Sequence, residues 1–462
     1  MSGYYYSSNK NHKPTTSLKI LKRRGPDKWY ETSCWHGSWG LAYFTPNKDD
    51  IEMLFYKDGF LLLDGYIYDE SPFSFYEWVY SNLSNNLNQS VEFIKTLNGE
   101  YSLTYISDDF VIFCTDEFSS KPLFFNNNGD DLIVSSLPNV VQELTNPPRF
   151  YRCYANTIYI YHRETKLIET VVNHEWDYSQ KITHFDYVFE AWENSFKNRY
   201  VDGLSSIALS AGYDSGLMAL TASKFFNDVD LYYAFNENEK NDIIKQRKEF
   251  HSFTTIYLQK DLHHKNEKPL IYNFYGEPDN PSLIRLQNLA PEDLTYNQFT
   301  FALSNLCEIY HNYMLPKGKR FIFVGRGADE IYADDSYPGF IKSDFNVFNG
   351  WFPKDLNTVY PEMITEKLLF KTSHRYDKVA GYFGIDTRFP FFDRTLFQAF
   401  LNTTQELKNK EYKSWISEYF RQHAYPFNET TDTYSSKQGF YHMDESQQNL
   451  KNMIEDEHST NI

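Results

Sequence analysis

The chain has 462 residues, of which 41% are hydrophobic and 18% aromatic, which is enough apolar surface for the cores of two or three globular domains. A formal net charge of −17 argues against a general electrostatic grip on nucleic acid or on an anionic membrane. No apolar run approaches the thickness of a bilayer, and the first residues lack the hydrophobic core of a signal peptide, so we expect a cytoplasmic protein with no membrane partner.

The first 165 residues are predicted to form a β-rich α+β domain. After a polar, turn-rich stretch of about 35 residues, helical spacing of apolar residues predicts helices near 73–84 and 91–96. Alternation of apolar and polar residues predicts strands over 38–44, 51–56, 60–67, 100–106, 110–115, 122–126 and 131–135. The four cysteines (Cys34, Cys114, Cys153 and Cys307) lie far apart and lack metal-binding spacing, so we predict buried thiols without zinc or disulfides.

Residues 166–182 are polar and aperiodic, which is typical of an interdomain linker. Strands and helices then alternate in a predicted second domain over 183–442, before a polar tail at 443–462. Such alternation predicts a parallel sheet with right-handed crossovers, whose ligand lies at the carboxyl ends of the strands. The predicted elements are helices 184–199, 215–226, 239–249 and 296–313, and strands 205–210, 231–235 and 254–258.

Small residues follow the strand 205–210 directly and precede a helix. The backbone N–H groups of such a turn, together with the start of the helix, attract phosphate. Ser210 and Ser215 add hydroxyl donors, and Asp214 adds a carboxylate that could hold Mg²⁺ between phosphate oxygens. Taken alone, the turn is equally consistent with an ordinary strand-to-helix connection capped by a serine or an aspartate.

A second strand, beginning at Phe321, runs into another small-residue loop. Gly325 and Gly327 let the backbone approach a ligand, and Asp329 could share a metal with Asp214. By itself this loop predicts no more than a glycine turn capped by Asp329. The presence of both loops in one predicted sheet favours a shared site.

The first loop, Ser210-Ala211-Gly212-Tyr213-Asp214-Ser215, resembles the Ser-Gly-Gly-x-Asp-Ser pyrophosphate loop of the N-type ATP pyrophosphatases, with Ala211 in place of a glycine. These include asparagine synthetases and β-lactam synthetases. The resemblance implies an α/β parallel-sheet ATP pyrophosphatase (PP-loop) domain, with ATP and Mg²⁺ as cofactors and Asp214 and Asp329 as metal ligands. The nucleotide-binding residues that it implies are Leu209, Ser210, Ala211, Gly212, Tyr213, Asp214, Ser215, Ala234 and Gly325.

The front half resembles the class II glutaminase domain that precedes the synthetase domain in asparagine synthetases, through phrases such as Arg24-Gly25-Pro26-Asp27 and Leu97-Asn98-Gly99-Glu100-Tyr101. The resemblance implies an Ntn-type (N-terminal nucleophile) β-sandwich. Ser2 replaces the nucleophilic Cys of that family, and a hydroxyl is far less ionised than a thiol. Asp64, Tyr66 and Asn98 replace residues that grip glutamine. We therefore interpret residues 1–165 as a degenerate glutaminase that acts as a scaffold.

Two further positions are predicted to be catalytic. Lys413 matches the family lysine that clamps developing negative charge on the adenylate, and Arg326 stands where asparagine synthetases have Glu and β-lactam synthetases have Tyr. Arginine stays protonated at neutral pH and can hold a carboxylate or phosphate with two hydrogen bonds. We therefore expect Arg326 to select a substrate other than aspartate. Arg388 and Asp393, in a segment resembling the family's Glu-x-Arg-x-Pro-Phe-Leu-Asp, are predicted to be structural.

Together these features predict an ATP-dependent, AMP-forming amide ligase that joins a small-molecule or peptide carboxylate to an amine without glutamine hydrolysis. The amine could be ammonia, a second molecule or part of the same molecule. The alternative is a catalytically inactive relative that binds nucleotide or regulates a partner. A tRNA-modifying enzyme with the same loop is disfavoured by the acidic charge, and the oligomeric state, a homodimer included, stays open.

Overall fold

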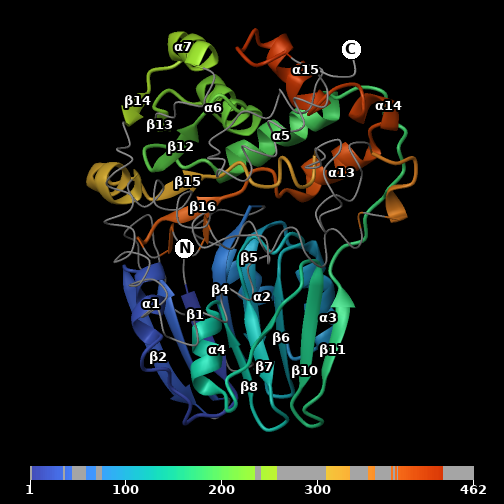
Figure 1. Cartoon of the computed structure of the whole chain (residues 1–462). Helices are drawn as coiled ribbons and strands as arrows, with labels where there is room; N and C mark the ends of the chain where they lie inside the picture. Colours follow the sequence, from blue (N-terminus) through green and yellow to red (C-terminus); the bar gives the residue numbers. More distant parts are fainter. Residues whose placement is uncertain are drawn as a thin grey trace, which may run out of the picture.

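The computed structural model describes residues 3–34, 37–43, 59–68, 75–234, 241–256, 309–332, 352–358, 360, 376–377, 380–381 and 383–429. Within these residues, two antiparallel sheets formed by the first part of the chain are followed by one parallel sheet (Figure 1). The architecture is thus mixed α/β. No helix in these ranges combines the length and the apolarity needed to cross a bilayer.

The first antiparallel sheet has six strands in the order β2-β3-β1-β8-β7-β9. Its central strand β1 pairs with β3 on one side and β8 on the other, which brings Tyr5 opposite both Gly40 and Ser135. The strands are β1 (Gly3–Ser7), β2 (Lys28–Cys34), β3 (Gly37–Tyr43), β7 (Phe124–Asn127), β8 (Leu132–Ser135) and β9 (Tyr151–Arg152).

The second antiparallel sheet has five strands in the order β11-β10-β6-β5-β4. Tyr4 and Tyr6 of the first sheet and Leu62 and Leu103 of the second belong to one buried cluster, so the two sheets share a core. The strands are β4 (Phe60–Ile67), β5 (Gly99–Ile106), β6 (Phe110–Thr115), β10 (Thr157–His162) and β11 (Ile168–Val172). Helices α1 (Leu18–Arg24), α2 (Phe75–Asn82), α3 (Leu87–Thr96) and α4 (Pro138–Leu144) accompany the sheets.

The strands predicted from alternation are present where the structure describes them, but two predictions need correction. The first 35 residues are not merely polar turns, because they contain β1, α1 and β2. The predicted linker 166–182 begins as β11, which pairs with β10 and extends the second sheet. Strands β9 and β10 and helix α4 were not predicted. The predicted strand 51–56 lies outside the described residues.

The parallel sheet has five strands in the order β14-β13-β12-β15-β16. The chain enters at the central strand, β12, moves outward through β13 to β14, and then crosses to β15 on the other side (Figure 1). The direction of winding therefore reverses between β12 and β15, where open parallel sheets commonly bind ligands. The strands are β12 (Ser205–Leu209), β13 (Asp230–Ala234), β14 (Thr254–Ile256), β15 (Phe321–Phe323) and β16 (Asp386–Arg388).

Helices surround this sheet and bury a second core that includes Trp192, Leu217 and Trp415. The helices are α5 (Asp186–Arg199), α6 (Tyr213–Phe225), α7 (Asn241–Phe250), α13 (Arg394–Asn402), α14 (Gln405–Lys408) and α15 (Ser414–Gln422), with short turns η1 (Tyr310–Met314), η2 (Leu315–Lys317) and η3 (Leu356–Thr358). Only the last residues of the predicted helix 296–313 are described, and they form the π-helical turn η1. The predicted tail 443–462 lies outside the described residues.

Candidate functional site

The first small-residue loop joins β12 to α6 and is held in shape by its own hydroxyls. The Ser210 N–H donates to Ser215 Oγ at 3.0 Å, the two hydroxyls lie 2.7 Å apart, and the Gly212 N–H donates to Ser210 Oγ at 3.1 Å. The helix then begins at Tyr213 behind Gly212, and no side chain caps its N-terminus in the described structure. The start of α6 therefore keeps the partial positive charge that favours an anion.

Arg247 of α7 holds the outer side of this loop. Its guanidinium donates to the carbonyl oxygens of Ser210 and Gly212, the latter at 2.9 Å, and to that of Pro426 at 3.0 Å. The guanidinium also lies over the Tyr425 ring, 4.9 Å from its centroid, and the side chain is fully buried. Arg247 therefore ties the first loop to the segment around Pro426. Sequence reasoning missed Arg247, since nothing in its local pattern distinguishes it from a solvated helix arginine.

The second loop follows β15 and lies against the first. A Cβ atom added to Gly325 would lie 2.8 Å from Asp214 Cβ, so only glycine permits this approach. Gly327 has a φ of +97°, and its added Cβ would lie 2.6 Å from the Phe392 ring. The carboxylate of Glu330 closes the turn by accepting the Gly327 N–H at 2.8 Å. The two loops predicted from the sequence are therefore neighbours in space.

Lys413 joins the two loops. Its ammonium group forms ion pairs with Asp214 Oδ1 and with Asp329 Oδ1, the latter at 2.8 Å. The neighbouring Tyr412 donates its hydroxyl to the same Asp329 oxygen at 2.8 Å. Lys413 precedes helix α15 with φ 47° and ψ 47°, a left-handed conformation that is uncommon for lysine. The structure thus brings together Asp214, Asp329 and Lys413, all three of which were named from the sequence.

Burial sets the electrostatics of this cluster. It raises the pKa of the Asp214 carboxyl to about 7, with Asp329 adding to the increase and Lys413 opposing it. Burial by itself would lower the pKa of Lys413, but its two carboxylate partners outweigh that effect and the pKa is raised. Lys413 therefore stays charged near neutral pH, and its ammonium group favours the ionised form of Asp214 against the effect of burial.

The two aspartates fit a magnesium ion that also binds phosphate. The described part of the chain holds no group of three or more His, Cys, Asp or Glu side chains able to hold a metal ion. Magnesium commonly takes only one or two carboxylates when phosphates and water supply its other oxygens. Asp214 and Asp329 meet that requirement, since both carboxylates reach one cation, the Lys413 ammonium group.

Arg326 lies in the second loop but has partners within the chain. Its guanidinium donates to Glu330 Oε1 at 3.1 Å and to the Tyr376 hydroxyl at 3.1 Å, and its side chain is 36% exposed. Glu330 therefore offsets part of the positive charge of Arg326, which the sequence analysis expected to bind a substrate. Any acidic ligand at Arg326 has to share the guanidinium with Glu330 or displace it.

The remaining predicted positions differ in how close they lie to the two loops. Leu209 ends β12 and Ala234 ends β13, and both strands run parallel, so the two residues lie at the same edge of the sheet as the loops. The side chains of Ala211 and Tyr213 are buried. Ser2, the replaced nucleophile, lies outside the described residues.

The altered glutaminase positions have partners within the chain, and one of them contacts the second domain directly. Asp64 is fully buried and accepts from Arg24 at 3.2 Å, and the same guanidinium donates to Asp377 of the second domain at 2.8 Å. The Tyr66 ring lies 3.6 Å from the guanidinium carbon of Arg388. The backbone carbonyl of Asn98 accepts the N–H of Tyr68. Of the substitutions read from the sequence as loss of glutamine binding, Tyr66 therefore contacts the second domain directly, and Asp64 is linked to it through Arg24.

Comparison with known proteins gives distant structural similarity only. No protein-family model matches the chain, and no curated protein matches its sequence. Glutamine phosphoribosylpyrophosphate (PRPP) amidotransferase from B. subtilis, solved with ADP and GMP, is 13% identical with a TM-score of 0.32, and the match covers 57% of this chain and 70% of that chain. A structure described as the allosteric regulatory enzyme of purine biosynthesis is also 13% identical, with a TM-score of 0.30 and the same coverage. Neither is described as an asparagine synthetase, so the resemblance to that family stays a prediction.

Proposed function

We propose that the chain is an ATP-dependent ligase that forms an amide bond by adenylating a substrate carboxylate. The observation that carries the proposal is the meeting of Asp214 and Asp329 on Lys413, at the point of the parallel sheet where the winding reverses. Two loops, one helix start and a buried cation converge there. That combination suits the phosphates of a nucleotide.

In the proposed reaction, a carboxylate oxygen of the substrate bonds to the α-phosphorus of ATP while the bond from that phosphorus to the bridging oxygen breaks. Pyrophosphate leaves, and an amine nitrogen then attacks the acyl carbon, expelling AMP and losing a proton. Magnesium, bound by Asp214 and Asp329, would neutralise charge on the phosphate oxygens. The start of α6 and the hydroxyls of Ser210 and Ser215 would hold the pyrophosphate portion.

Lys413 is proposed to stabilise the negative charge that develops on the phosphate oxygens. It is 4% exposed, so the surroundings screen its charge less than water would. A nucleotide with its metal would compete for the carboxylates that now bind the ammonium group. Lys413 would then exchange carboxylate partners for phosphate partners without leaving the site.

The proposed substrate differs from that of asparagine synthetases. Arg326 carries a positive charge that its ion pair with Glu330 offsets only in part. The arginine side chain is 36% exposed, so a ligand can still reach it. We propose that Arg326 binds a carboxylate or phosphate of the substrate, while the buried Glu330, which also accepts the Gly327 N–H, holds the guanidinium in place. Ammonia remains a candidate amine, with no glutamine hydrolysis in the first domain.

The direct test is pyrophosphate release in the presence of ATP, Mg²⁺ and a library of carboxylic acids, each with and without ammonia. Release that depends on one class of acid, and that is lost in Asp214→Asn, supports the ligase. Replacing Arg326 by Glu should change which acids are accepted. Unchanged acid preference in Arg326→Glu would reject the role given to that residue.

A second candidate is a nucleotide-binding protein without turnover. Lys413 forms ion pairs with two carboxylates, and Arg326 forms one with Glu330. Both cations therefore already have anionic partners within the chain, which favours this candidate. Thermal stabilisation by ATP and Mg²⁺ without pyrophosphate release for any acid would favour this candidate over the ligase. Absence of stabilisation would argue against both.

A further inference from the structure

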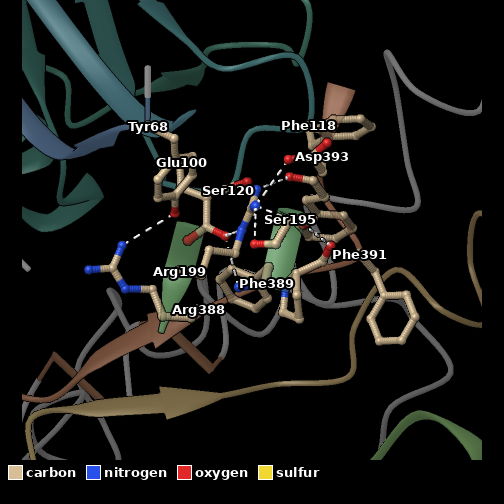
Figure 2. Close-up of polar contacts among 12 residues, drawn as sticks. Tyr68, Glu100, Phe118, Ser120, Ser195, Arg199, Arg388, Phe389, Phe391 and Asp393 are labelled. Carbon is tan, nitrogen blue, oxygen red and sulfur yellow. Dashed lines mark hydrogen bonds and ion pairs between the residues drawn. The ribbon is translucent and has the colours of Figure 1, made fainter. Parts of the chain in front are cut away.

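We infer that Glu100, in the first domain, is a positioning residue for the second loop of the candidate site. It acts through residues 388–393, here called the bridging segment, which contact both domains. The inference concerns what keeps loop residues 324–332 in position. Only the measurement of nucleotide binding rests on the proposed function. Figure 2 shows the Glu100 carboxylate beside Arg199, on which most of the polar contacts meet, and toward the backbone of Phe389.

Glu100 lies on β5 and is fully buried. Its Oε1 atom accepts the backbone N–H of Phe389 at 2.9 Å and the Nε–H of Arg199 at 2.6 Å. A buried carboxylate is costly unless its partners compensate its charge. Arg199 supplies that charge, and Phe389 supplies a direct link to the bridging segment.

Arg199 extends the effect of Glu100 to the far end of the bridging segment. Its guanidinium donates to the Phe392 carbonyl at 2.7 Å and to Asp393 Oδ2 at 3.0 Å, and it lies over the Tyr68 ring at 4.5 Å (Figure 2). The other carboxylate oxygen of Asp393 caps helix α13 by accepting the N–H groups of Thr395 and Leu396, each at 3.0 Å. One first-domain carboxylate thus orients an arginine that holds the end of this segment and the start of a helix.

The bridging segment in turn holds the second loop. The Arg388 carbonyl accepts the Val324 N–H at 2.9 Å, immediately before Gly325. The Phe391 carbonyl accepts the Tyr332 hydroxyl at 2.8 Å, at the other end of the loop. Between these two bonds, Gly327 packs against the Phe392 ring. Loop residues 324–332 are therefore fixed at both ends and in the middle by the bridging segment.

Other contacts tie the bridging segment to the first domain. The Phe118 ring stacks on Phe392 with centroids 5.6 Å apart and an interplanar angle of 9°. Arg388 donates to the Tyr68 hydroxyl at 3.3 Å. Glu100 differs from these residues because one of its oxygens, Oε1, accepts both the backbone N–H of Phe389 and the N–H of Arg199. Arg199 in turn anchors the other end of the bridging segment. Loss of its charge should therefore loosen the whole segment, and with it Asp329.

The test is amide hydrogen exchange of the full chain, followed by mass spectrometry of peptides covering 324–332, in wild type and Glu100→Gln. The glutamine keeps the size and one acceptor but loses the charge that orders Arg199. We expect exchange in 324–332 to be about tenfold to a hundredfold faster, since hydrogen bonds to charged groups are the stronger ones. Affinity for a nonhydrolysable ATP analogue with Mg²⁺ should fall by about tenfold in the same variant.

The matched control is Glu117→Gln, which removes another buried first-domain carboxylate that pairs across the interface, with Arg394. In the described part of the chain Glu117 makes no hydrogen bond to residues 388–393, and its charge only repels that of Asp393. Its loss should therefore lower stability without selectively exposing 324–332. Arg199→Lys serves as a second variant if Glu100→Gln does not fold, because it keeps the charge but loses the forked contacts to Phe392 and Asp393. Fast exchange in 324–332 is expected there too.

Exchange in 324–332 that is unchanged in the variant tested, or no faster than in Glu117→Gln, would overturn the role of Glu100. This outcome is distinct from failure of the proposed function. If wild type binds no nucleotide, the ligase and the nucleotide-binding alternative both fail, while the exchange comparison still decides whether Glu100 holds the loop.

Discussion

Lys413 donates to Asp329 at 2.8 Å from a backbone held in the left-handed conformation, and the same ammonium group reaches Asp214. One buried cation therefore links the two loops. Because the Lys413 ammonium group pairs with both carboxylates, it competes with any metal ion that Asp214 and Asp329 could bind.

Replacing Lys413 by Met should increase the affinity for Mg²⁺ measured without nucleotide. Two neighbouring carboxylates lose their compensating charge, so we expect a gain of at least about tenfold, equivalent to about 1.4 kcal/mol. Calorimetric titration with Mg²⁺ measures this, and turnover by the proposed ligase should be lost. Lys410→Met, at a side chain 57% exposed, is the control and should leave Mg²⁺ affinity unchanged. Equal affinities in wild type and Lys413→Met would contradict the competition.

Replacing Gly325 by Ala should separate the two loops. The new methyl group would lie 2.8 Å from Asp214 Cβ, closer than real side chains approach, so backbone must move. We expect a loss of about 1–3 kcal/mol of stability, typical of overpacking, and weaker binding of nucleotide. Thermal shift with and without ATP and Mg²⁺ measures both effects. Gly203→Asn is the control, because that position has open space and a left-handed φ that Asn tolerates.

Replacing Arg247 by Met should destabilise the first loop from outside. The carbonyl groups of Ser210, Gly212 and Pro426 would lose their shared donor, and leaving buried acceptors unpaired costs about 2–4 kcal/mol in sum. A lower thermal midpoint and weaker nucleotide binding are the expected results. Arg421→Met removes a 40% exposed arginine that pairs with Glu411, and it should change the midpoint much less. Similar losses in the two variants would argue against a special role for Arg247.

The stability of the first domain should depend on the protonation of Asp116. Burial, with a contribution from Glu117, raises the pKa of Asp116 to about 7, above its ordinary value near 4. The folded state then holds this proton more tightly than the unfolded state, so the contribution to stability is complete below pH 4 and is lost as the pH rises through 7. The change is at most about 4 kcal/mol, at about 1.4 kcal/mol per pKa unit.

Thermal midpoints of wild type and Asp116→Asn, measured from pH 4 to pH 8, test this dependence. The advantage of wild type over the variant should shrink as the pH rises, because asparagine does not titrate. Asp109→Asn, at an exposed position of the same domain, should show a constant difference from wild type. A constant difference for Asp116→Asn as well would show that the carboxyl does not titrate in this range.

Local pattern was sufficient to predict most strands and helices of the described chain. The apolar residues at the start of 60–67 and the apolar run before Ser210 became β4 and β12, because apolar side chains that cluster in sequence must meet a core in space. The small-residue loops were likewise sufficient to name Asp214 and Asp329, whereas Lys413 was named through the resemblance to asparagine synthetases. Local pattern failed for β1, whose residues Tyr4, Tyr5 and Tyr6 are all buried and do not alternate with polar residues.

Tertiary structure alone decided how those residues are used. The partners of Arg326, the anchoring by Arg247 and the contact of Glu100 with Phe389 join residues that are distant in sequence or that carry no local signal. Asp64 and Tyr66 suggested only a loss of glutamine binding until tertiary packing placed Arg24 of the first domain against Asp64 and Arg388 of the second against Tyr66. The physical reason is that periodicity reports which face of an element is buried, whereas the partner of a buried charge depends on which other element packs there.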